Sequence, residues 1–299
     1  MLVDFHIHST ASDGTCAPSE LAEKAKGFAA VALTDHDNCD GIEEFEKCER
    51  FEGCERFAGV ELSIAPGKGF DKFHLLGLGI DPANEGLRSF LMRILDGRNA
   101  RNERIVANFR RLGIEMESPD PIEQSNNQNN RTIYSYAHGE VLARPHFARW
   151  LVDHGHAADL RDAFAKYLLP ESPFATRCYE ERWHPAQEDV FRTIHAAGGI
   201  CVMAHPKYWR VDWKTAGCDF AAAERELAAL KERGLDGVES LYQANTNEEN
   251  IAFTRIATKL GYLKTAGSDF HGANKPTIPL GMEVSEDFIA PVLERLDMI

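Results

Sequence analysis

The stretch LVDFHIH, residues 2–8, indicates the fold class of this chain. Apolar and polar side chains alternate along it, which predicts a β-strand with two unlike faces. The strand ends on His6 and His8, two imidazoles two residues apart and therefore on one face. At the carboxyl end of a strand in an α/β protein, such a pair indicates a polar site, because active sites lie at that end.

The combination of a short apolar strand and a polar end recurs along the chain. Further strands are expected at 29–33, 57–64, 73–80, 199–204, 237–241 and 263–267. Helices are expected at 18–28, 41–51, 187–197, 220–233 and 246–260, with a last helix after residue 285. Seven strands linked by helices predict an α/β protein, built as a parallel barrel or as an open sheet.

A different pattern interrupts this alternation between residues 85 and 182. A long helical stretch is expected at 84–112, a mobile loop rich in Pro, Asn and Gln at 118–131, and helical segments at 139–154 and 157–167. We therefore expect an α/β domain formed by residues 1–84 and 183–299, and an inserted, mainly helical cap domain formed by residues 85–182.

Composition and charge exclude several classes of protein. Among the 299 residues no apolar run approaches the ~18 needed to span a membrane, and the first residues lack the features of a signal peptide. The seven cysteines include no C-x-x-C pair, so reduced thiols and a cytoplasmic location are expected. The net charge of −14 argues against stable binding of duplex nucleic acid by a broad basic surface.

Polar residues at the predicted strand ends form a set of candidate metal ligands. The set is His6, His8, Asp13, His36, Glu61, His74, His205, Asp269 and His271. A lone H-x-H or Asp-His pair has ordinary structural explanations, but the joint occurrence favours a shared site. Three carboxylates brought together raise one another's pKa unless cations are bound. Imidazole and carboxylate without thiolate suit Zn, Mn or Fe, and nine ligands with one bridging carboxylate suit three ions.

Four blocks of this set resemble the motifs of the PHP (polymerase and histidinol phosphatase) family of metal-dependent phosphoesterases. They are HIH (6–8), TDHD (34–37), AHP (204–206) and GSDFH (267–271). The resemblance implies a distorted (β/α)7 barrel with a trinuclear metal site. It also implies hydrolysis of a phosphoester by a hydroxide that bridges two ions, so that no Ser or Cys nucleophile is required.

The resemblance also distributes the ligands over three divalent ions. The first takes His6, His8, Glu61 and Asp269; the second shares Glu61 and adds His74 and His205; the third takes Asp13, His36 and His271. Some family members have histidine in place of Asp13, and an aspartate there favours manganese, with iron or zinc as alternatives. Asp35 and Asp37 flank His36 and are expected to orient it.

The insertion carries the candidate substrate-binding residues. Residues 86–182 contain 14 basic and 13 acidic residues, so this part repels an anion less than the rest of the chain does. The segment RPHFAR, residues 144–149, resembles the cap of the PHP subgroup that acts on nucleotide phosphates. We expect phosphate binding by Arg144, His146, Arg149, Lys166 and Lys207, although arginines commonly just cover exposed helix faces. His146 is alternatively the acid that protonates the leaving oxygen.

These features predict a hydrolase acting on nucleotide phosphoesters. The expected substrate is a nucleoside 3′,5′-bisphosphate that loses its 3′-phosphate, or a short single-stranded 5′-phosphorylated RNA cut from its 5′ end. Histidinol phosphate phosphatase is the main alternative, against which the long arginine-bearing insertion argues. A non-catalytic PHP module is a second alternative, but such a module should have lost ligands. The ligand set alone also permits a metal-dependent amidase or deaminase.

Overall fold

The computed structural model describes residues 1–49, 51–66, 73–116, 143–210, 213 and 217–298. The chain forms two compact units, Met1–Leu91 with His184–Ile299, and Met92–Trp183. The long helix α3 (Glu85–Arg111) crosses from the first unit into the second. Its first residues thus belong to the α/β unit, which differs from the expected boundary at residue 85.

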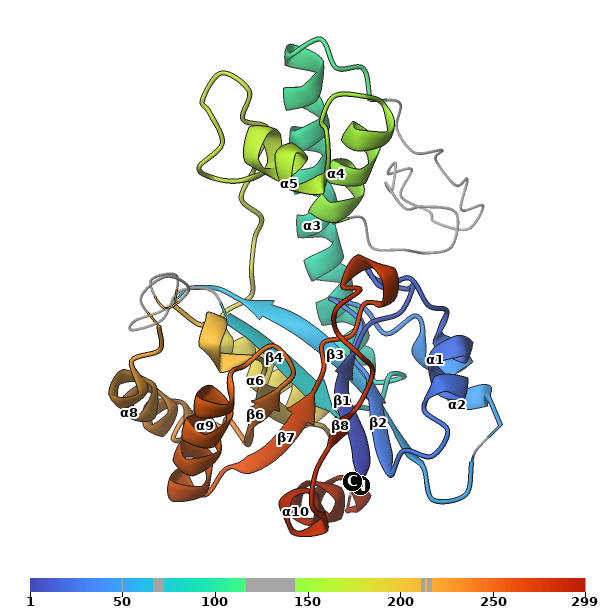
Figure 1. Cartoon of the computed structure of the whole chain (residues 1–299), viewed down its shortest axis with the longest axis vertical. Helices are drawn as coiled ribbons and strands as arrows, with labels where there is room; N and C mark the ends of the chain where they lie inside the picture. The colour runs from blue at the N-terminus through green and yellow to red at the C-terminus, as the bar shows by residue number, and fades with distance from the viewer. Residues whose placement is uncertain (50, 67–72, 117–142, 211–212, 214–216, 299) are drawn as a thin grey trace. The chain divides into compact units, whose positions relative to one another are not determined.

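The first unit is an α/β barrel (Figure 1). Its strands are β1 (Leu2–Ile7), β2 (Ala30–Leu33), β3 (Glu55–Ile64), β4 (Phe73–Leu78), β5 (Ile200–Met203), β6 (Gly237–Tyr242) and β7 (Leu263–Gly267), which are neighbours in chain order. The barrel closes where the chain after β7 meets β1, because the His8 N–H donates to the Phe270 carbonyl and the Asp269 N–H donates to the His6 carbonyl. The expected seven-stranded α/β barrel is confirmed, with a short β8 (Met282–Glu283) added beside β1.

The barrel is not parallel throughout, since β4 runs antiparallel to both β3 and β5. The physical reason is the connection at residues 65–72, which is shorter than the dozen or more residues that a parallel crossover needs. As a result, the first residues of β4 lie at the same barrel end as the last residues of β3 and β5. His74, near the start of β4, can therefore lie close to side chains that follow other strands.

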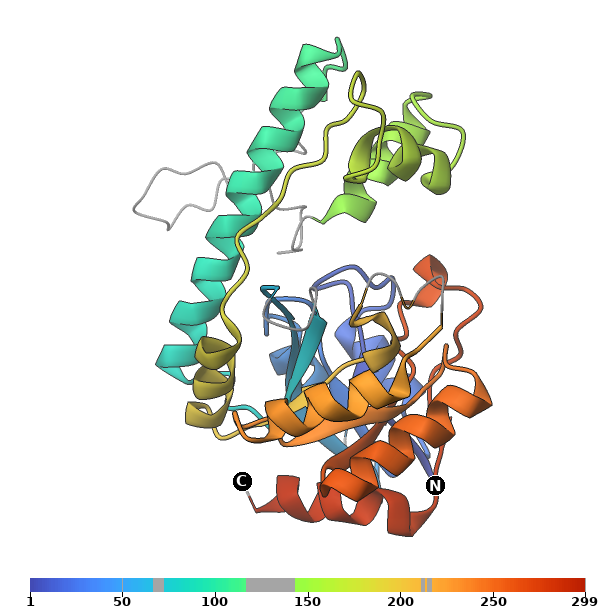
Figure 2. The ribbon, with the colours of Figure 1, turned by 90° about the vertical axis from the view of Figure 1, so that its left-hand side faces the viewer.

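Helices cover the outside of the barrel and one of its ends. The helices α1 (Pro18–Lys24), α2 (Ile42–Lys47), α6 (Gln187–Ala196), α8 (Phe220–Lys231) and α9 (Asn247–Leu260) lie around the sheet. α10 (Glu286–Asp297) runs across the end where β1 begins (Figure 2). Its Ile289, Val292 and Leu296 pack into the same buried cluster as Val3 and Phe5, which leaves the opposite end for polar side chains.

The alternation expected for β1 is broken by one extra residue. The register between β1 and β2 shifts between Asp4 and Ile7, as in a β-bulge. Val3 and Phe5 pack in one apolar cluster, whereas Ile7 packs in another with Leu21 of α1. A bulge of this kind redirects the side chains that follow it and is common next to active sites.

The second unit is helical in its described part. Besides α3 it contains α4 (Arg144–Asp153), α5 (Leu160–Ala163) and a π-helical turn, η1 (Phe164–Leu168). The helix expected from residue 157 begins later because Asp159 caps it, its side chain accepting from the Asp162 N–H. Phe109, Phe147, Leu151 and other apolar residues form its core. The loop predicted at 118–131 and the start of the segment at 139–154 lie outside the described residues.

None of the described helices is both long and apolar enough to cross a membrane.

Candidate metal centre

All nine predicted ligands converge at the barrel end opposite α10, around the carboxylate of Glu61. Glu61 lies on β3 and is almost completely buried. Its Oε2 lies 3.3 Å from Nε2 of His6, 3.2 Å from Nε2 of His8 and 2.9 Å from Nδ1 of His36. Its Oε1 lies 2.7 Å from Nδ1 of His74 and 3.1 Å from Nε2 of His205. One carboxylate thus contacts five imidazoles.

The two aspartates complete the cluster on the side of His271. Oδ1 of Asp13 lies 3.2 Å from Nε2 of His271 and 3.8 Å from Nε2 of His36. Oδ1 of Asp269 lies 3.4 Å from Nε2 of His8 and 3.4 Å from Nδ1 of His271. The nine residues come from segments as far apart in sequence as His6 and His271, and all belong to the first unit.

The donor atoms of this cluster fit bound cations. Nε2 of His6, Nε2 of His8, Oδ1 of Asp13 and Oε2 of Glu61 are buried and make no hydrogen bond to any described residue. Buried polar atoms are normally hydrogen-bonded, so four such atoms without a hydrogen bond at one place indicate a binding site for a ligand. Three groups of ligand atoms lie close enough together to hold an ion: His6, His8 and Glu61; His36, Glu61 and His74; and His8, Asp13, His36 and His271.

The charges of the cluster are strongly coupled. Burial by itself would raise the pKa of Glu61, but the imidazoles of His36, His74 and His6 hold that pKa well below its usual range. Burial lowers the pKa of the His74 ring to about 4, despite the neighbouring Glu61 carboxylate. The Glu61 carboxylate is therefore ionised and His74 is neutral near pH 7, which are the forms that bind metal.

Backbone strain is concentrated at the same place. Among the described residues, only three non-glycine residues have a positive φ: Asp37 (57°), His205 (28°) and Asp269 (59°). Two of them are cluster residues and the third follows His36. Such conformations cost of order 1–3 kcal/mol each and persist where the surroundings enforce them, typically at functional sites.

Asp35 supports the cluster, although not by contact with the His36 ring. Its carboxylate accepts hydrogen bonds from the Ser9 N–H (2.8 Å), the Ser9 hydroxyl (2.6 Å) and the Ser12 hydroxyl (2.5 Å). These bonds fix the loop between His8 and Asp13. The N–H of Asp37 donates to the Glu61 carbonyl and so holds the chain after His36 beside β3.

Four residues that hold the cluster in place were not predicted from the sequence. Asp4 accepts from the backbone and hydroxyl of Ser268. Tyr242 and Lys275 both donate to Oδ2 of Asp269, at 2.9 Å and 2.6 Å. Glu239 contacts His6 and His205. The signal that could have revealed Glu239 is a charged residue inside the otherwise apolar strand at 237–241.

A fourth group of potential ligands lies at the opposite end of the barrel. His195, Cys201 and Asp236 face one another, but Oδ2 of Asp236 already lies 2.7 Å from Nε2 of His195 and accepts from the Cys201 N–H. Burial raises the pKa of the Cys201 thiol well above its usual value, so the thiol stays protonated. This group fits a metal poorly.

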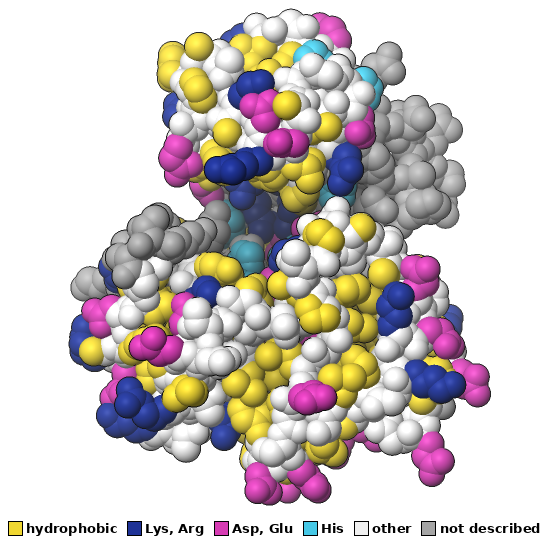
Figure 3. All heavy atoms as spheres, in the orientation of Figure 1, with side chains coloured by type: hydrophobic (Ala, Val, Ile, Leu, Met, Phe, Trp, Pro, Cys, Tyr) yellow, Lys and Arg dark blue, Asp and Glu magenta, His cyan; other side chains and the backbone are white. Residues whose placement is uncertain are grey.

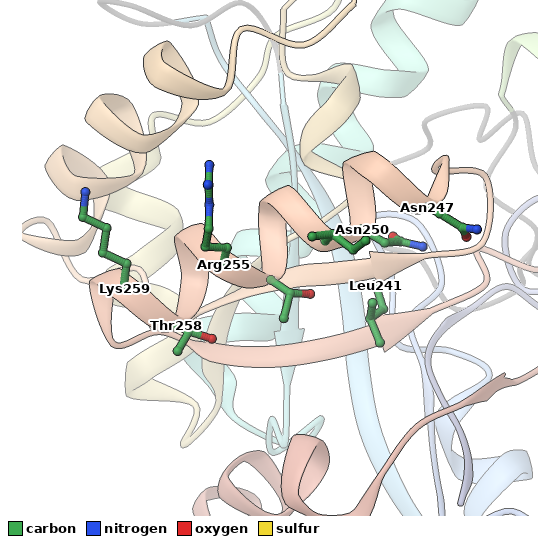
Figure 4. A pocket seen from close by; sticks show the side chains of 8 residues that line it. Leu241, Asn247, Asn250, Arg255, Thr258 and Lys259 are labelled. Carbon is green, nitrogen blue, oxygen red and sulfur yellow. The ribbon is translucent and has the colours of Figure 1, made fainter.

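A separate open groove lies beside α9 and is lined by Leu241, Asn250 and Arg255 among others (Figure 4). It contains no predicted site residue.

Of the five predicted substrate residues, four lie in the second unit. Arg144 is partly buried and lies over the ring of Tyr179, at 5.4 Å from the ring centre. Nδ1 of His146 accepts from the Ala143 N–H at the start of α4. Lys166 pairs with Asp162 at 2.7 Å, and Arg149 is exposed. Lys207, in the first unit, pairs with Glu249 at 2.9 Å. Their roles in binding remain predictions.

The second unit also gathers arginines that sequence analysis did not single out. Arg98 and Arg101 lie three residues apart on α3 and are buried, with 6% and 4% of their surface exposed. Burial, together with the nearby charges of Arg98, Arg182 and Arg144, lowers the pKa of Arg101 to about 8. The guanidinium group can donate two parallel hydrogen bonds to one phosphate or carboxylate. We refer to Arg98, Arg101, Arg144 and Arg182 as the arginine cluster.

Comparison with known proteins identifies the family. The PHP domain matches residues 4–142. A 3′,5′-nucleoside bisphosphate phosphatase from Chromobacterium violaceum is 32% identical over 271 residues, covering 90% of this chain and 87% of the relative. The chain belongs to the PHP family. A second relative, a 5′-3′ exoribonuclease from Haemophilus influenzae, is 31% identical over 272 residues, covering 90% of this chain and 89% of the relative.

A solved structure has a similar fold over the whole chain. The structure of an amidohydrolase from Chromobacterium violaceum, with bound sulfate and no metal, superimposes with a TM-score of 0.77 at 29% identity. It covers 99% of this chain and 96% of its own. The similarity therefore extends over the PHP barrel and the inserted helical part together.

Proposed function

We propose that this PHP protein is a metal-dependent phosphoesterase that hydrolyses nucleotide phosphoesters. The observation that carries the proposal is the buried cluster of six imidazoles and three carboxylates with four orphaned donor atoms. We further propose that it holds three ions, with manganese as the physiological metal. All seven cysteines are free thiols, which supports action in the reducing cytoplasm.

The nine residues of the cluster would be distributed over three ions. His6, His8, Glu61 and Asp269 would hold one ion, His74 and His205 would hold a second with Glu61, and Asp13, His36 and His271 a third. Bound ions of this kind supply an activated water near neutral pH and neutralise phosphoryl oxygens. The chain supplies the fixed positions of these ligands, through the Asp35 bonds to the His8–Asp13 loop and the bonds of Tyr242 and Lys275 to Asp269.

We propose that the arginine cluster binds a phosphate group that is not hydrolysed. Arginine suits this role because its planar guanidinium donates two parallel hydrogen bonds to phosphate. A nucleoside 3′,5′-bisphosphate or a short 5′-phosphorylated RNA carries one phosphate for binding and a second phosphoester for hydrolysis. Basic and acidic side chains are interspersed on the face of the barrel unit seen in Figure 3. The net charge of −14 likewise argues for such small single-stranded substrates over duplexes.

The first test is phosphate release by manganese-loaded protein from adenosine 3′,5′-bisphosphate, with histidinol phosphate as the comparison substrate. We expect the bisphosphate to be preferred, because only it offers an anionic group to the arginine cluster beside the ester. Removal of metal with a chelator should abolish turnover, and Mn²⁺ should restore it. Equal or better turnover of histidinol phosphate would contradict the proposed substrate class while leaving the metal centre intact.

A further inference from the structure

Glu239 is a fully buried carboxylate on β6 that contacts two cluster residues at once. Its Oε1 lies 2.9 Å from Nδ1 of His6, and its Oε2 accepts a 2.6 Å hydrogen bond from the backbone N–H of His205. Glu239 is not among the nine ligands. A carboxylate is costly to bury unless its oxygens are satisfied, so these two contacts define its environment.

The contact with His6 determines which nitrogen of that ring can bind an ion. A carboxylate oxygen that lies 2.9 Å from a ring nitrogen accepts a hydrogen bond from it, so this contact favours a proton on Nδ1. The lone pair is then on Nε2, which is buried, lies 3.3 Å from Oε2 of Glu61 and has no hydrogen-bond partner among the described residues. Histidines that bind metal commonly donate their other N–H to a carboxylate in this way.

The contact with His205 holds a strained backbone. His205 has φ 28° and ψ 65°, outside the regions that non-glycine residues usually occupy. The hydrogen bond from its N–H to Glu239 holds this conformation, in which Nε2 of His205 lies 3.1 Å from Oε1 of Glu61. One carboxylate thereby holds two imidazoles, one on β1 and one just after β5.

The fold makes room for Glu239 to reach across the intervening strand. The register between β6 and β7 shifts between Glu239 and Leu241, a bulge like that in β1. On β7, a Cβ added at Gly267 would lie 2.0 Å from Oε1 of Glu239 and 2.6 Å from Cβ of His6. Only glycine at this position lets the carboxylate pass between β6 and His6.

We propose that Glu239 is a positioning residue for the metal centre. It selects the His6 tautomer with the proton on Nδ1 and holds the backbone of His205, so that both rings present Nε2 to the bound ions. This inference rests on the metal centre of the proposed function but not on its substrate.

The test is the isosteric variant Glu239→Gln, assayed for metal content and affinity in metal-depleted protein reconstituted with Mn²⁺. A carboxamide has only one acceptor oxygen, whereas the site presents two donors. Its NH₂ must therefore face either Nδ1 of His6 or the N–H of His205, and one of the two ligands is displaced. We expect Mn²⁺ affinity to fall about 10–100-fold, with fewer ions bound per chain.

The matched control is Asp236→Asn. Asp236 also joins a histidine ring to a backbone N–H, but at the opposite end of the barrel, so this variant should bind Mn²⁺ as the wild type does. Wild-type affinity in Glu239→Gln, or an equal loss in Asp236→Asn, would overturn the inference. A wild-type protein that binds no metal would overturn the proposed function itself.

A second measurement needs no Glu239 variant and so does not depend on the folding of one. Nitrogen-15 NMR of the zinc-loaded wild type reports which nitrogen of each histidine ring carries the proton, with the His6 signals assigned from His6→Asn. The proposal requires the proton on Nδ1 of His6. A proton on Nε2 would contradict it.

Discussion

Replacing Glu61 with glutamine should reduce phosphoester hydrolysis roughly 10³-fold or more and lower the metal content of the purified protein. Glu61 is the one residue whose two oxygens face five imidazoles, so the bound ions depend on its charge. The amide keeps the shape of the side chain but removes that charge, and it turns an NH₂ group toward ring nitrogens. The measurements are phosphate release from adenosine 3′,5′-bisphosphate and metal analysis of the same sample.

The control for this variant is Glu55→Gln, on the same strand but exposed at its other end. It should keep both activity and metal. If Glu61→Gln retained the wild-type metal content and rate, Glu61 could not be the bridging ligand, and the division of the nine residues over three ions would be wrong.

Replacing Arg144 or Arg101 with alanine should weaken kcat/KM for adenosine 3′,5′-bisphosphate by about 10–100-fold and leave metal content unchanged. A hydrogen bond to a charged group is worth about 1.5–3 kcal/mol, and each 1.36 kcal/mol is a factor of ten in rate. Arg101 is buried on α3 among the other guanidinium groups of the arginine cluster, and Arg144 approaches it from α4. Steady-state kinetics with the bisphosphate test this expectation.

A matched arginine on the same helix separates this effect from a general loss of positive charge. Arg110 of α3 is exposed, and Arg110→Ala should behave as the wild type does. A substrate that lacks the second phosphate should also be insensitive to Arg144→Ala and Arg101→Ala. Unchanged kinetics in both variants would exclude the arginine cluster from substrate binding.

Much of the barrel could be predicted from the sequence because its strands are short, apolar and followed by polar residues. The strand at 263–267 was predicted with its observed bounds, β7 Leu263–Gly267. The direction of β4 was not predicted, although the connection at residues 65–72 is too short for a parallel crossover. The bulge in β1 was not predicted either, because apolar and polar residues alternate regularly from Val3 to His8 although the strand contains one extra residue.

The candidate metal ligands were readable from the sequence because their chemistry is local. Imidazoles and carboxylates directly after apolar strands can act as metal ligands in any fold that brings the strand ends together. The residues that support them were not readable, because Glu239 and the arginine cluster acquire a role only through contacts between distant segments. Glu239 contacts His6 although 233 positions of the chain separate them. The burial of Glu239 and of the arginine cluster depends on the side chains that pack around them.

The sequence by itself therefore determined the barrel class and the kind of metal site. Only the tertiary structure decided which carboxylate orients the ligands and which arginines face one another, because these depend on distance and desolvation.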